Sequence, residues 1–165
     1  MSAAPIARVV TVSTRAAAGA WQDTSGPVVV DALRALGFDC ADPIVVPDGD
    51  DVARVLRQAA ADDVHLVMTT GGTGHTPADL TPEQTLTVID RQSPGLAEAV
   101  RAYGVAQGVP TAILSRGVAG IAGRTLIVNL PGSTGGARDG VAALAPVLVH
   151  AVDQIRGGDH PRLLA

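Results

Sequence analysis

The chain has 165 residues, of which 47% are hydrophobic, 17% charged and 2% aromatic, and its net charge at pH 7 is −4. This composition excludes general disorder and predicts one domain with a core of Val, Leu, Ile and Ala. The negative charge and the lack of a basic run argue against nucleic-acid binding. All twelve basic residues are arginine, so no lysine is available for a Schiff base or a Walker phosphate loop.

The remaining bulk features exclude several further kinds of site. Cys40 is the only cysteine, so no internal disulfide can form, and we expect it to be a small buried residue. The four histidines lack the spacing of a zinc site. Residues 1–8 lack the basic-then-apolar order that is typical of a signal peptide, and the apolar residues 140–152 are too few to cross a membrane. We therefore expect a cytoplasmic protein without membrane contact.

The predicted elements in chain order begin with a β-branched strand over residues 6–12. A long loop over 13–24 leads into a helix over 25–36, which Gly37 ends. Further strands are expected over 43–46, 64–68, 111–114 and 125–128. Further helices are expected over 50–61, capped by Asp50 or Asp51, and over 82–90, 94–106 and 137–155, and Pro146 should kink the last one.

This alternation of strands and helices predicts an α/β domain with a parallel sheet covered by helices on both faces. We expect a single domain over residues 1–156 and a flexible tail over 157–165. In such sheets ligands bind outside the carboxyl ends of the strands. The segments that leave those ends hold many of the Ser, Thr, Asp and Gly residues, and they should meet at one rim: 13–24, 47–51, 70–80 and 129–136.

The most informative stretch is residues 68–84, which reads MTTGGTGHTPADLTPEQ. Thr81 as cap, Pro82 in the first turn and Gln84 predict a helix start. The eleven-residue loop before it, 70–80, exceeds the usual 2–6 residues and holds three glycines, hydroxyls and Asp79. That composition favours a phosphate site beside an acid over a plain surface turn. His75 directly follows Gly74, so the loop is not a dinucleotide fingerprint.

Several residues have two interpretations each. Asp79 and Asp48 are each either Mg²⁺ ligands or proton acceptors beside phosphates, or only complements of a helix N-terminus. The sequence NLPGS, over residues 129–133, presents an amide and a hydroxyl to a ligand or is an ordinary turn. Arg116 and Arg138 either clamp a phosphate or are solvated. Alone, the strand-end residues Thr11, Ser13 and Arg15 are equally ambiguous.

Together these segments resemble the MogA/MoaB molybdenum-cofactor biosynthesis proteins and a related domain of gephyrin. The resemblance covers roughly residues 9–155 and rests on five motifs in the same order: TVSTR with DTSGP, VPD, TTGGTG with DLTPE, PTAILSR, and NLPGS. It implies a three-layer α/β/α molybdopterin-binding fold with a mostly parallel sheet. It also implies an adenylyltransferase that uses Mg²⁺ and ATP to place AMP on the terminal phosphate of molybdopterin. A homotrimer or hexamer is expected, with a downstream protein that inserts molybdate.

The resemblance implies that Asp48 and Asp79 are the catalytic residues and hold Mg²⁺. The substrate-binding residues that it implies are Thr11, Ser13, Thr70, Gly71, Gly72, Thr73, Gly74, Ser115, Asn129, Pro131, Gly132 and Ser133. The chain departs from the family at Thr14, where an Asp is common, and at 134–136, where Pro and Lys usually follow. The altered residues 134–136 leave a carrier that binds molybdopterin without turnover as one alternative. The low charge fraction is consistent with a second alternative, an oligomeric assembly protein.

Overall fold

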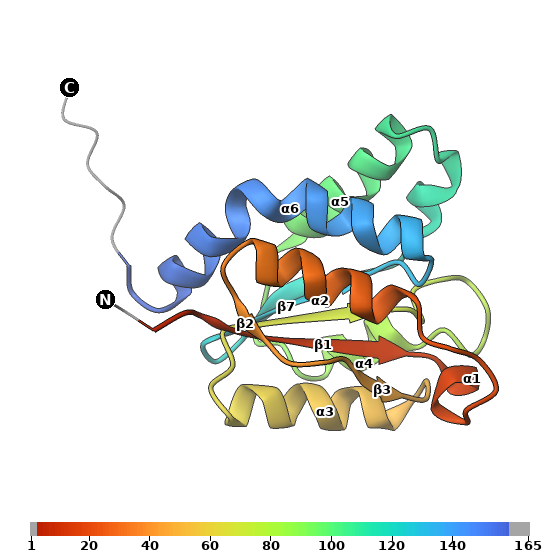
Figure 1. Cartoon of the computed structure of the whole chain (residues 1–165), viewed down its shortest axis with the longest axis horizontal. Helices are drawn as coiled ribbons and strands as arrows, with labels where there is room; N and C mark the ends of the chain where they lie inside the picture. Colours follow the sequence, from red (N-terminus) through yellow and green to blue (C-terminus); the bar gives the residue numbers. More distant parts are fainter. Residues whose placement is uncertain (1–2, 159–165) are drawn as a thin grey trace.

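The computed structural model, which describes residues 3–158, has three layers with one sheet in the middle (Figure 1). The sheet contains seven strands in the order β2-β1-β4-β7-β6-β5, with β3 also paired to β1. Their bounds are β1 Ile6–Val12, β2 Asp39–Cys40, β3 Ile44–Val46, β4 Leu66–Thr70, β5 Arg91–Gln92, β6 Ala119–Ala122 and β7 Thr125–Leu130. Strands β1, β2, β3, β4 and β7 pair in parallel, whereas β6 runs antiparallel to β7 and β5. The expected three-layer α/β/α fold with a mostly parallel sheet is confirmed.

Helices cover both faces of this sheet (Figure 1). On one face lie α2 (Ser25–Ala35), α5 (Pro94–Ala106) and α6 (Thr134–Ile155), and on the other lie α3 (Asp50–Ala61) and α4 (Thr81–Leu86). The short α1 (Thr14–Ala17) follows β1, and the 3₁₀ helix η1 (Pro110–Leu114) follows α5. The carboxyl ends of the parallel strands point away from the side where the chain begins and α6 ends.

The alternation of side chains along each central strand divides the core in two. Val9, Met68 and Val128 are fully buried on the face of α2 and α6. Their strand neighbours Val10, Val67 and Ile127 are fully buried on the face of α3. Strands buried on both faces read as continuous apolar runs, which explains why β4 was recognisable in the sequence. Cys40 is buried, as expected, in the first core, and burial raises the pKa of its thiol.

The strand expected over residues 111–114 is wrong, because this segment is the 3₁₀ helix η1. Pro110 starts it, and short-range bonds from Ala112 N–H to Val109 O and from Ser115 N–H to Ala112 O hold it. Ile113 is 65% exposed, so no sheet covers this segment. Local hydrogen bonds therefore outweigh its β propensity. The antiparallel edge is made instead by β5 and β6, neither of which was predicted from the sequence.

Two expected helix caps are also wrong. The N-cap of α3 is Gly49, at φ +107°, and Asp50 and Asp51 lie in the first helical turn. The N-cap of α4 is Leu80, which makes no side-chain cap bond, while Thr81 is already helical and fully buried. Each residue that was expected to cap a helix therefore lies inside that helix.

The loop predicted over 13–24 contains a helix, and the described residues end in a turn after α6. Ser13 caps α1 by accepting a hydrogen bond from Ala16 N–H, 3.2 Å away. After α6, Gly157 and Gly158 are held by bonds to Gln154 O and Asp153 O. The rest of the expected tail, 159–165, lies outside the described residues. The domain limits therefore remain predictions.

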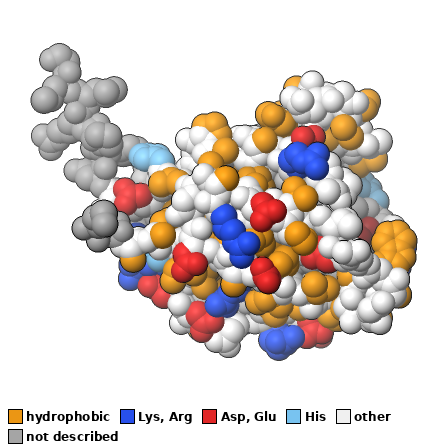
Figure 2. All heavy atoms as spheres, in the orientation of Figure 1, with side chains coloured by type: hydrophobic (Ala, Val, Ile, Leu, Met, Phe, Trp, Pro, Cys, Tyr) orange, Lys and Arg blue, Asp and Glu red, His pale blue; other side chains and the backbone are white. Residues whose placement is uncertain are grey.

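Acidic and basic side chains are interspersed with apolar and neutral ones on the face shown in Figure 2. In the part of the chain that the structure describes, no helix combines the length and hydrophobicity needed to cross a bilayer.

Candidate functional site

Two adjoining hollows open at the carboxyl ends of β1, β3, β4 and β7. The larger hollow has a volume of about 660 Å³ and the smaller hollow about 410 Å³. All four segments that were expected to meet contribute to their walls. The larger hollow is lined by Gly72, Thr73, Gly74, His75, Asp79, Val100, Gly104, Val109, Thr111, Ala112, Leu114, Ser115, Pro131, Gly132, Ser133, Gly135, Gly136 and Asp139. The smaller hollow is lined by Thr11, Val12, Ser13, Thr14, Arg15, Ala16, Trp21, Gln22, Asp23, Thr24, Ser25, Asp48, Thr70, Gly71, Gly72, Ala78, Asp79 and Gly132.

Three residues form a wall that the two hollows share: Gly72, Asp79 and Gly132. Molecules bound in the two hollows would therefore meet beside one carboxylate and two residues that have no side chain. This is the arrangement that a reaction between two substrates requires, because it brings their reacting groups together.

The glycines at the start of the loop allow it to pass directly over the strand ends. Gly71 has φ +102°, and a Cβ there would collide with Val12 O. Gly72 has φ +66°, and its Cβ would collide with Thr81 Oγ1 and approach Asp48 Oδ1 to 2.5 Å. Residues with side chains rarely adopt these angles, so glycine is needed for both the conformation and the space.

The loop also presents unused hydrogen-bond donors. The backbone N–H groups of Gly72, Thr73 and Gly74 donate to no other group of residues 3–158. All three residues line the larger hollow. Successive free N–H groups form a site for an anion such as a phosphate.

Asp48 lies in the smaller hollow with an unsatisfied oxygen. Its Oδ1 is buried and has no hydrogen-bond partner among the described residues. Burial raises the pKa of this carboxyl, and the negative charge of Asp79 raises it further, against the opposing effect of the nearby Leu80 backbone N–H. A buried carboxylate oxygen without a donor is costly unless a cation or a proton joins it. Asp48 is thus suited to hold a cation.

The backbone of Asp48 is held in place by Thr14. The N–H of Asp48 donates to Thr14 Oγ1 at 3.2 Å. Thr14 is one of the two departures from the family pattern, and its hydroxyl serves as a neutral acceptor at this position. At the other departure, residues 134–136, a threonine hydroxyl again makes a structural hydrogen bond. Thr134 Oγ1 lies 2.9 Å from Thr24 Oγ1 and so links the starts of α6 and α2.

Asp79 is ordered by the loop that contains it. Its Oδ2 accepts hydrogen bonds from the N–H of Thr76 at 3.0 Å and from the Thr76 hydroxyl at 2.8 Å. A Cβ at Gly74 would lie 2.7 Å from the same oxygen, so the loop closes tightly around the carboxylate. The fixed side chain lines both hollows.

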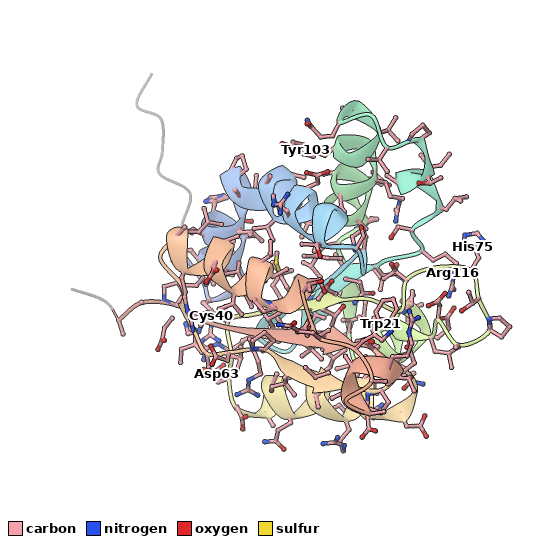
Figure 3. The ribbon with its side chains drawn as sticks, turned by 45° about the vertical axis from the view of Figure 1, so that its right-hand side comes forward. Trp21, Cys40, Asp63, His75, Tyr103 and Arg116 are labelled. Carbon is pink, nitrogen blue, oxygen red and sulfur yellow. The ribbon has the colours of Figure 1, made fainter. Side chains whose placement is uncertain are left out.

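Arg116 braces the glycine loop instead of lining a hollow. Its guanidinium donates to the backbone oxygens of Gly74 at 2.7 Å and Asp79 at 2.5 Å, and forms an ion pair with Glu83. The backbone N–H of Arg116 donates to Thr73 O, and the ring of His75 contacts Leu114 O at 2.9 Å. Figure 3 shows Arg116 and His75 at the same end of the molecule as Trp21, opposite Cys40 and Asp63. A phosphate clamp at Arg116 is therefore not supported.

We expect Arg116→Ala to loosen this loop. Loss of charge-assisted bonds to two partly buried carbonyl groups should lower the free energy of unfolding by about 1.5–3 kcal/mol. Amide exchange at residues 71–79 should become faster. Arg138 is exposed and forms no ion pair within residues 3–158, so Arg138→Ala is the control. Unchanged exchange in Arg116→Ala would contradict the bracing role.

Most of the expected substrate-binding residues line a hollow, but several of their side chains are already engaged. The Thr11 hydroxyl donates to Asp23 Oδ2 at 2.7 Å, and the Thr70 hydroxyl donates to Pro131 O at 2.7 Å. Ser13 caps α1, and Ser133 caps α6 by accepting from Gly136 N–H. The expected residues that line the larger hollow are Gly72, Thr73, Gly74, Ser115, Pro131, Gly132 and Ser133.

Asn129 is the expected residue that the structure places away from both hollows. It is 1% exposed. Its amide donates to Thr69 Oγ1 at 3.0 Å and Thr85 Oγ1 at 2.9 Å, and its Oδ1 accepts from Val118 N–H at 3.1 Å. The amide therefore links β4, α4 and the residue before β6, and its direct contact with a ligand is corrected to a supporting position behind the site.

Several lining residues were not predicted from the sequence. Trp21 and Asp23 line the smaller hollow, and Asp139 lines the larger one together with α5 and η1. Trp21 is the only tryptophan and lies in an expected ligand loop, which was the available signal. The apolar side chains of α5 carry no comparable signal, because their pattern is that of any packed helix.

Among the described residues, few carboxylates lie close enough together to bind a metal ion. No group of three or more His, Cys, Asp or Glu residues suited to a metal occurs within residues 3–158. Asp48 and Asp79 still fit Mg²⁺, which usually binds one or two carboxylates and completes its shell with water and substrate phosphates. The unsatisfied Oδ1 of Asp48 is the observation that supports this fit.

Comparison with known proteins agrees with this geometry. Residues 8–150 match the family described as "Probable molybdopterin binding domain". The chain belongs to this family. This match confirms the resemblance noted from the motifs. The matched residues include all those that line the two hollows.

Individual relatives cover nearly all of the chain. The molybdopterin adenylyltransferase of Helicobacter pylori strain J99 is 36% identical over 153 residues, which are 90% of this chain and 86% of the relative. The solved structure of the molybdopterin biosynthesis Mog protein from Mycobacterium ulcerans has a TM-score of 0.89 at 50% identity, covering 94% and 99% of the two chains. A molybdopterin biosynthesis protein from Mycobacterium abscessus has a TM-score of 0.87 at 43% identity, covering 92% and 96%.

Proposed function

We propose that this protein is a molybdopterin adenylyltransferase, which transfers AMP from ATP to the terminal phosphate of molybdopterin. The observation that carries the proposal is the shared wall of the two hollows. There Asp79 lies within the reach of both substrates, and Asp48 presents a buried oxygen without a partner. The names of the curated relatives support the same activity.

The two hollows provide one site for each substrate. A phosphate oxygen of molybdopterin attacks the α-phosphorus of ATP, the bond from that phosphorus to the β-phosphate oxygen breaks, and pyrophosphate leaves. The free N–H groups of Gly72, Thr73 and Gly74 hold phosphate oxygens near the shared wall. Most of the rate enhancement then comes from positioning the two phosphates and from stabilising charge.

Asp48 and Asp79 are the residues that would hold Mg²⁺. When bound, Mg²⁺ neutralises charge on the phosphates and polarises the phosphorus. The protein contributes a desolvated carboxylate at Asp48 and an oriented one at Asp79, whose Oδ2 is already fixed by Thr76. Thr14 fixes the backbone position of Asp48.

The direct test is AMP transfer by purified protein with molybdopterin, ATP and Mg²⁺, with Asp79→Asn beside the wild type. We expect adenylylated molybdopterin and pyrophosphate from the wild type, and a kcat at least about tenfold lower for Asp79→Asn, because an amide provides less negative charge for the cation. Product formed at the same rate by both proteins would contradict the role of Asp79. No product from the wild type, with molybdopterin still bound, would select the carrier function.

The carrier alternative rests on the two departures from the family pattern. Thr134 and the glycines that follow supply no cation at the start of α6. A carrier would bind molybdopterin tightly and leave ATP unchanged. Restoring the family residues at 14 and 134–136 would then be expected to introduce turnover, which offers a second way to separate the two functions.

We further propose that the protein acts in the cytoplasm as a homotrimer or hexamer and passes its product to a molybdate-insertion protein. Exposed apolar side chains support self-association: Val105, Val109, Ile113 and Leu114 near α5 and η1 are 41–65% exposed. Light scattering measured with size-exclusion chromatography tests the oligomer. A monomer at micromolar concentration would contradict it.

A further inference from the structure

The feature that carries a further inference is a paired arginine and tryptophan at the edge of the smaller hollow. The guanidinium carbon of Arg15 lies 3.8 Å from the centroid of the Trp21 ring. Trp21 is nevertheless 60% exposed, although it is the only tryptophan in a chain with 2% aromatic residues. Arginine therefore covers the indole only in part, and the side chain keeps a large accessible surface.

The backbone holds this pair in a fixed position. The N–H groups of Ala20 and Trp21 both donate to Arg15 O, at 2.9 and 3.3 Å. On the far side of Trp21, Asp23 accepts from Thr11 Oγ1 and from Gly26 N–H, which anchors the loop to β1 and α2. An aromatic side chain on a backbone that is anchored at both sides loses little conformational entropy when it binds a ligand.

Charge gives the pair a second role. Arg15 is the only Arg among the described residues that line either hollow. It forms no ion pair with a carboxylate within residues 3–158. The same smaller hollow contains the carboxylates of Asp48 and Asp79. A polyphosphate that enters it therefore meets one free guanidinium, which matches phosphate oxygens with paired donors.

We propose that Trp21 and Arg15 form the nucleotide-recognition element of the protein. The purine of ATP stacks on the accessible indole of Trp21, and the polyphosphate pairs with Arg15. This inference rests on the proposed function, assigns ATP to the smaller hollow and leaves the larger hollow to the pterin. Bases stack on aromatic rings without a strict sequence preference, so the element recognises a purine mainly by its face and its phosphates.

Trp21 itself provides the test, because it is the single tryptophan of the protein. The full chain is titrated with the non-hydrolysable α,β-methylene analogue of ATP without molybdopterin, and indole fluorescence is recorded. We expect a saturable change in the intensity or wavelength of the emission. Adenosine should produce the same kind of change at higher concentration, whereas inorganic triphosphate should bind with a smaller change, because it lacks the base.

Variants separate the two contacts, and calorimetry measures their affinity for the analogue. Trp21→Ala should raise the Kd at least about fivefold, whereas Trp21→Phe should stay within about threefold of the wild type. Arg15→Ala should weaken the analogue and triphosphate about tenfold or more and adenosine much less. Arg91 is exposed on β5, at the far edge of the sheet, and lines neither hollow. Arg91→Ala is therefore the matched control for loss of one positive charge and should not change the Kd.

Each outcome decides between the proposals. Unchanged fluorescence on binding, unchanged affinity in Trp21→Ala and Arg15→Ala, or no binding of the analogue at millimolar concentration would overturn the inference. If the analogue binds as expected but AMP transfer fails, the recognition element stands and the proposed function fails. If AMP transfer proceeds equally in wild type, Trp21→Ala and Arg15→Ala at ATP concentrations below KM, the proposed function stands and the inference fails.

Discussion

Replacing Asp48 with asparagine is expected to remove most AMP transfer and, at the same time, to stabilise the protein. Asparagine has the same shape as aspartate but lacks the negative charge that would hold Mg²⁺ and the phosphates. Electrostatic stabilisation is usually the largest catalytic contribution, so we expect kcat to fall by about 10²-fold or more. The carboxylate oxygen Oδ1 is buried without a partner, so replacing the carboxylate with a neutral amide removes an unfavourable buried charge.

The pH dependence of this stabilisation has a defined sign. Burial, followed by the charge of Asp79, raises the pKa of Asp48 in the folded state above its ordinary value of 3.8. Below that value Asp48 is protonated in both states, and the variant should have no advantage. As the pH rises from 3.8 through the raised folded pKa, the unfolded state of the wild type loses its proton first and becomes relatively more stable. The advantage of Asp48→Asn should grow across this window and then stay constant.

Thermal unfolding in metal-free buffer between pH 3 and pH 8 measures this difference. For a chain of this size each kcal/mol changes the Tm by about 2–4 °C. Asp50→Asn is the control, because Asp50 is exposed in the first turn of α3 and favourable to the helix N-terminus. That variant should be slightly less stable than the wild type and fully active. A Tm of Asp48→Asn below the wild type at neutral pH would show that the buried charge is compensated.

The parts of the fold that the sequence predicted best are those with strong local signals. Strand β1 was predicted with its observed bounds, and α2 and α5 were predicted to within one residue. Each has a clear start or stop, such as the proline at the start of α5, and a continuous apolar pattern. The antiparallel edge was missed because β5 has only two residues and depends on pairing with β6, which no local pattern indicates.

The location of the candidate site could be predicted from the sequence, but the hydrogen-bond partners of its side chains could not. Parallel strands with polar carboxyl ends indicated where the four segments meet, and a glycine loop beside Asp79 indicated the centre. The sequence could not show that the Asn129 amide turns inward to Thr69 and Thr85, because these partners lie 60 and 44 residues away. It also could not show that Arg116 binds the loop's own carbonyl groups, 37 and 42 residues away, instead of a ligand.

The glycine loop also explains why the site can form without a large set of charged residues. Its N–H groups provide donors, its lack of side chains leaves room at the shared wall, and Arg116 fixes its shape from behind. The cost is paid in backbone conformation, since Gly71 and Gly72 both adopt angles that other residues avoid. Stability and the shape of the site are therefore linked most tightly at these two residues.

Gly71→Ala is expected to be the most destabilising single change in this loop. Its Cβ would require an unfavourable φ of +102° and would collide with Val12 O at the end of β1. Gly71 N–H also donates to Leu130 O at 3.2 Å, so the backbone has little freedom to move between β1 and β7. Backbone strain of about 1–2 kcal/mol and overpacking of about 1–3 kcal/mol together predict a loss of about 2–5 kcal/mol.

Gly37→Ala is the matched control, because it isolates the backbone term. Gly37 follows α2 with φ +91°, but a Cβ there would meet no atom within 4 Å. We expect it to cost only about 1–2 kcal/mol and to leave AMP transfer unchanged. Urea unfolding of both variants, with equal m-values, measures the difference that belongs to the contact with Val12. Equal stability of the two variants would mean that β1 moves aside without cost, and the glycine would then be needed for conformation alone.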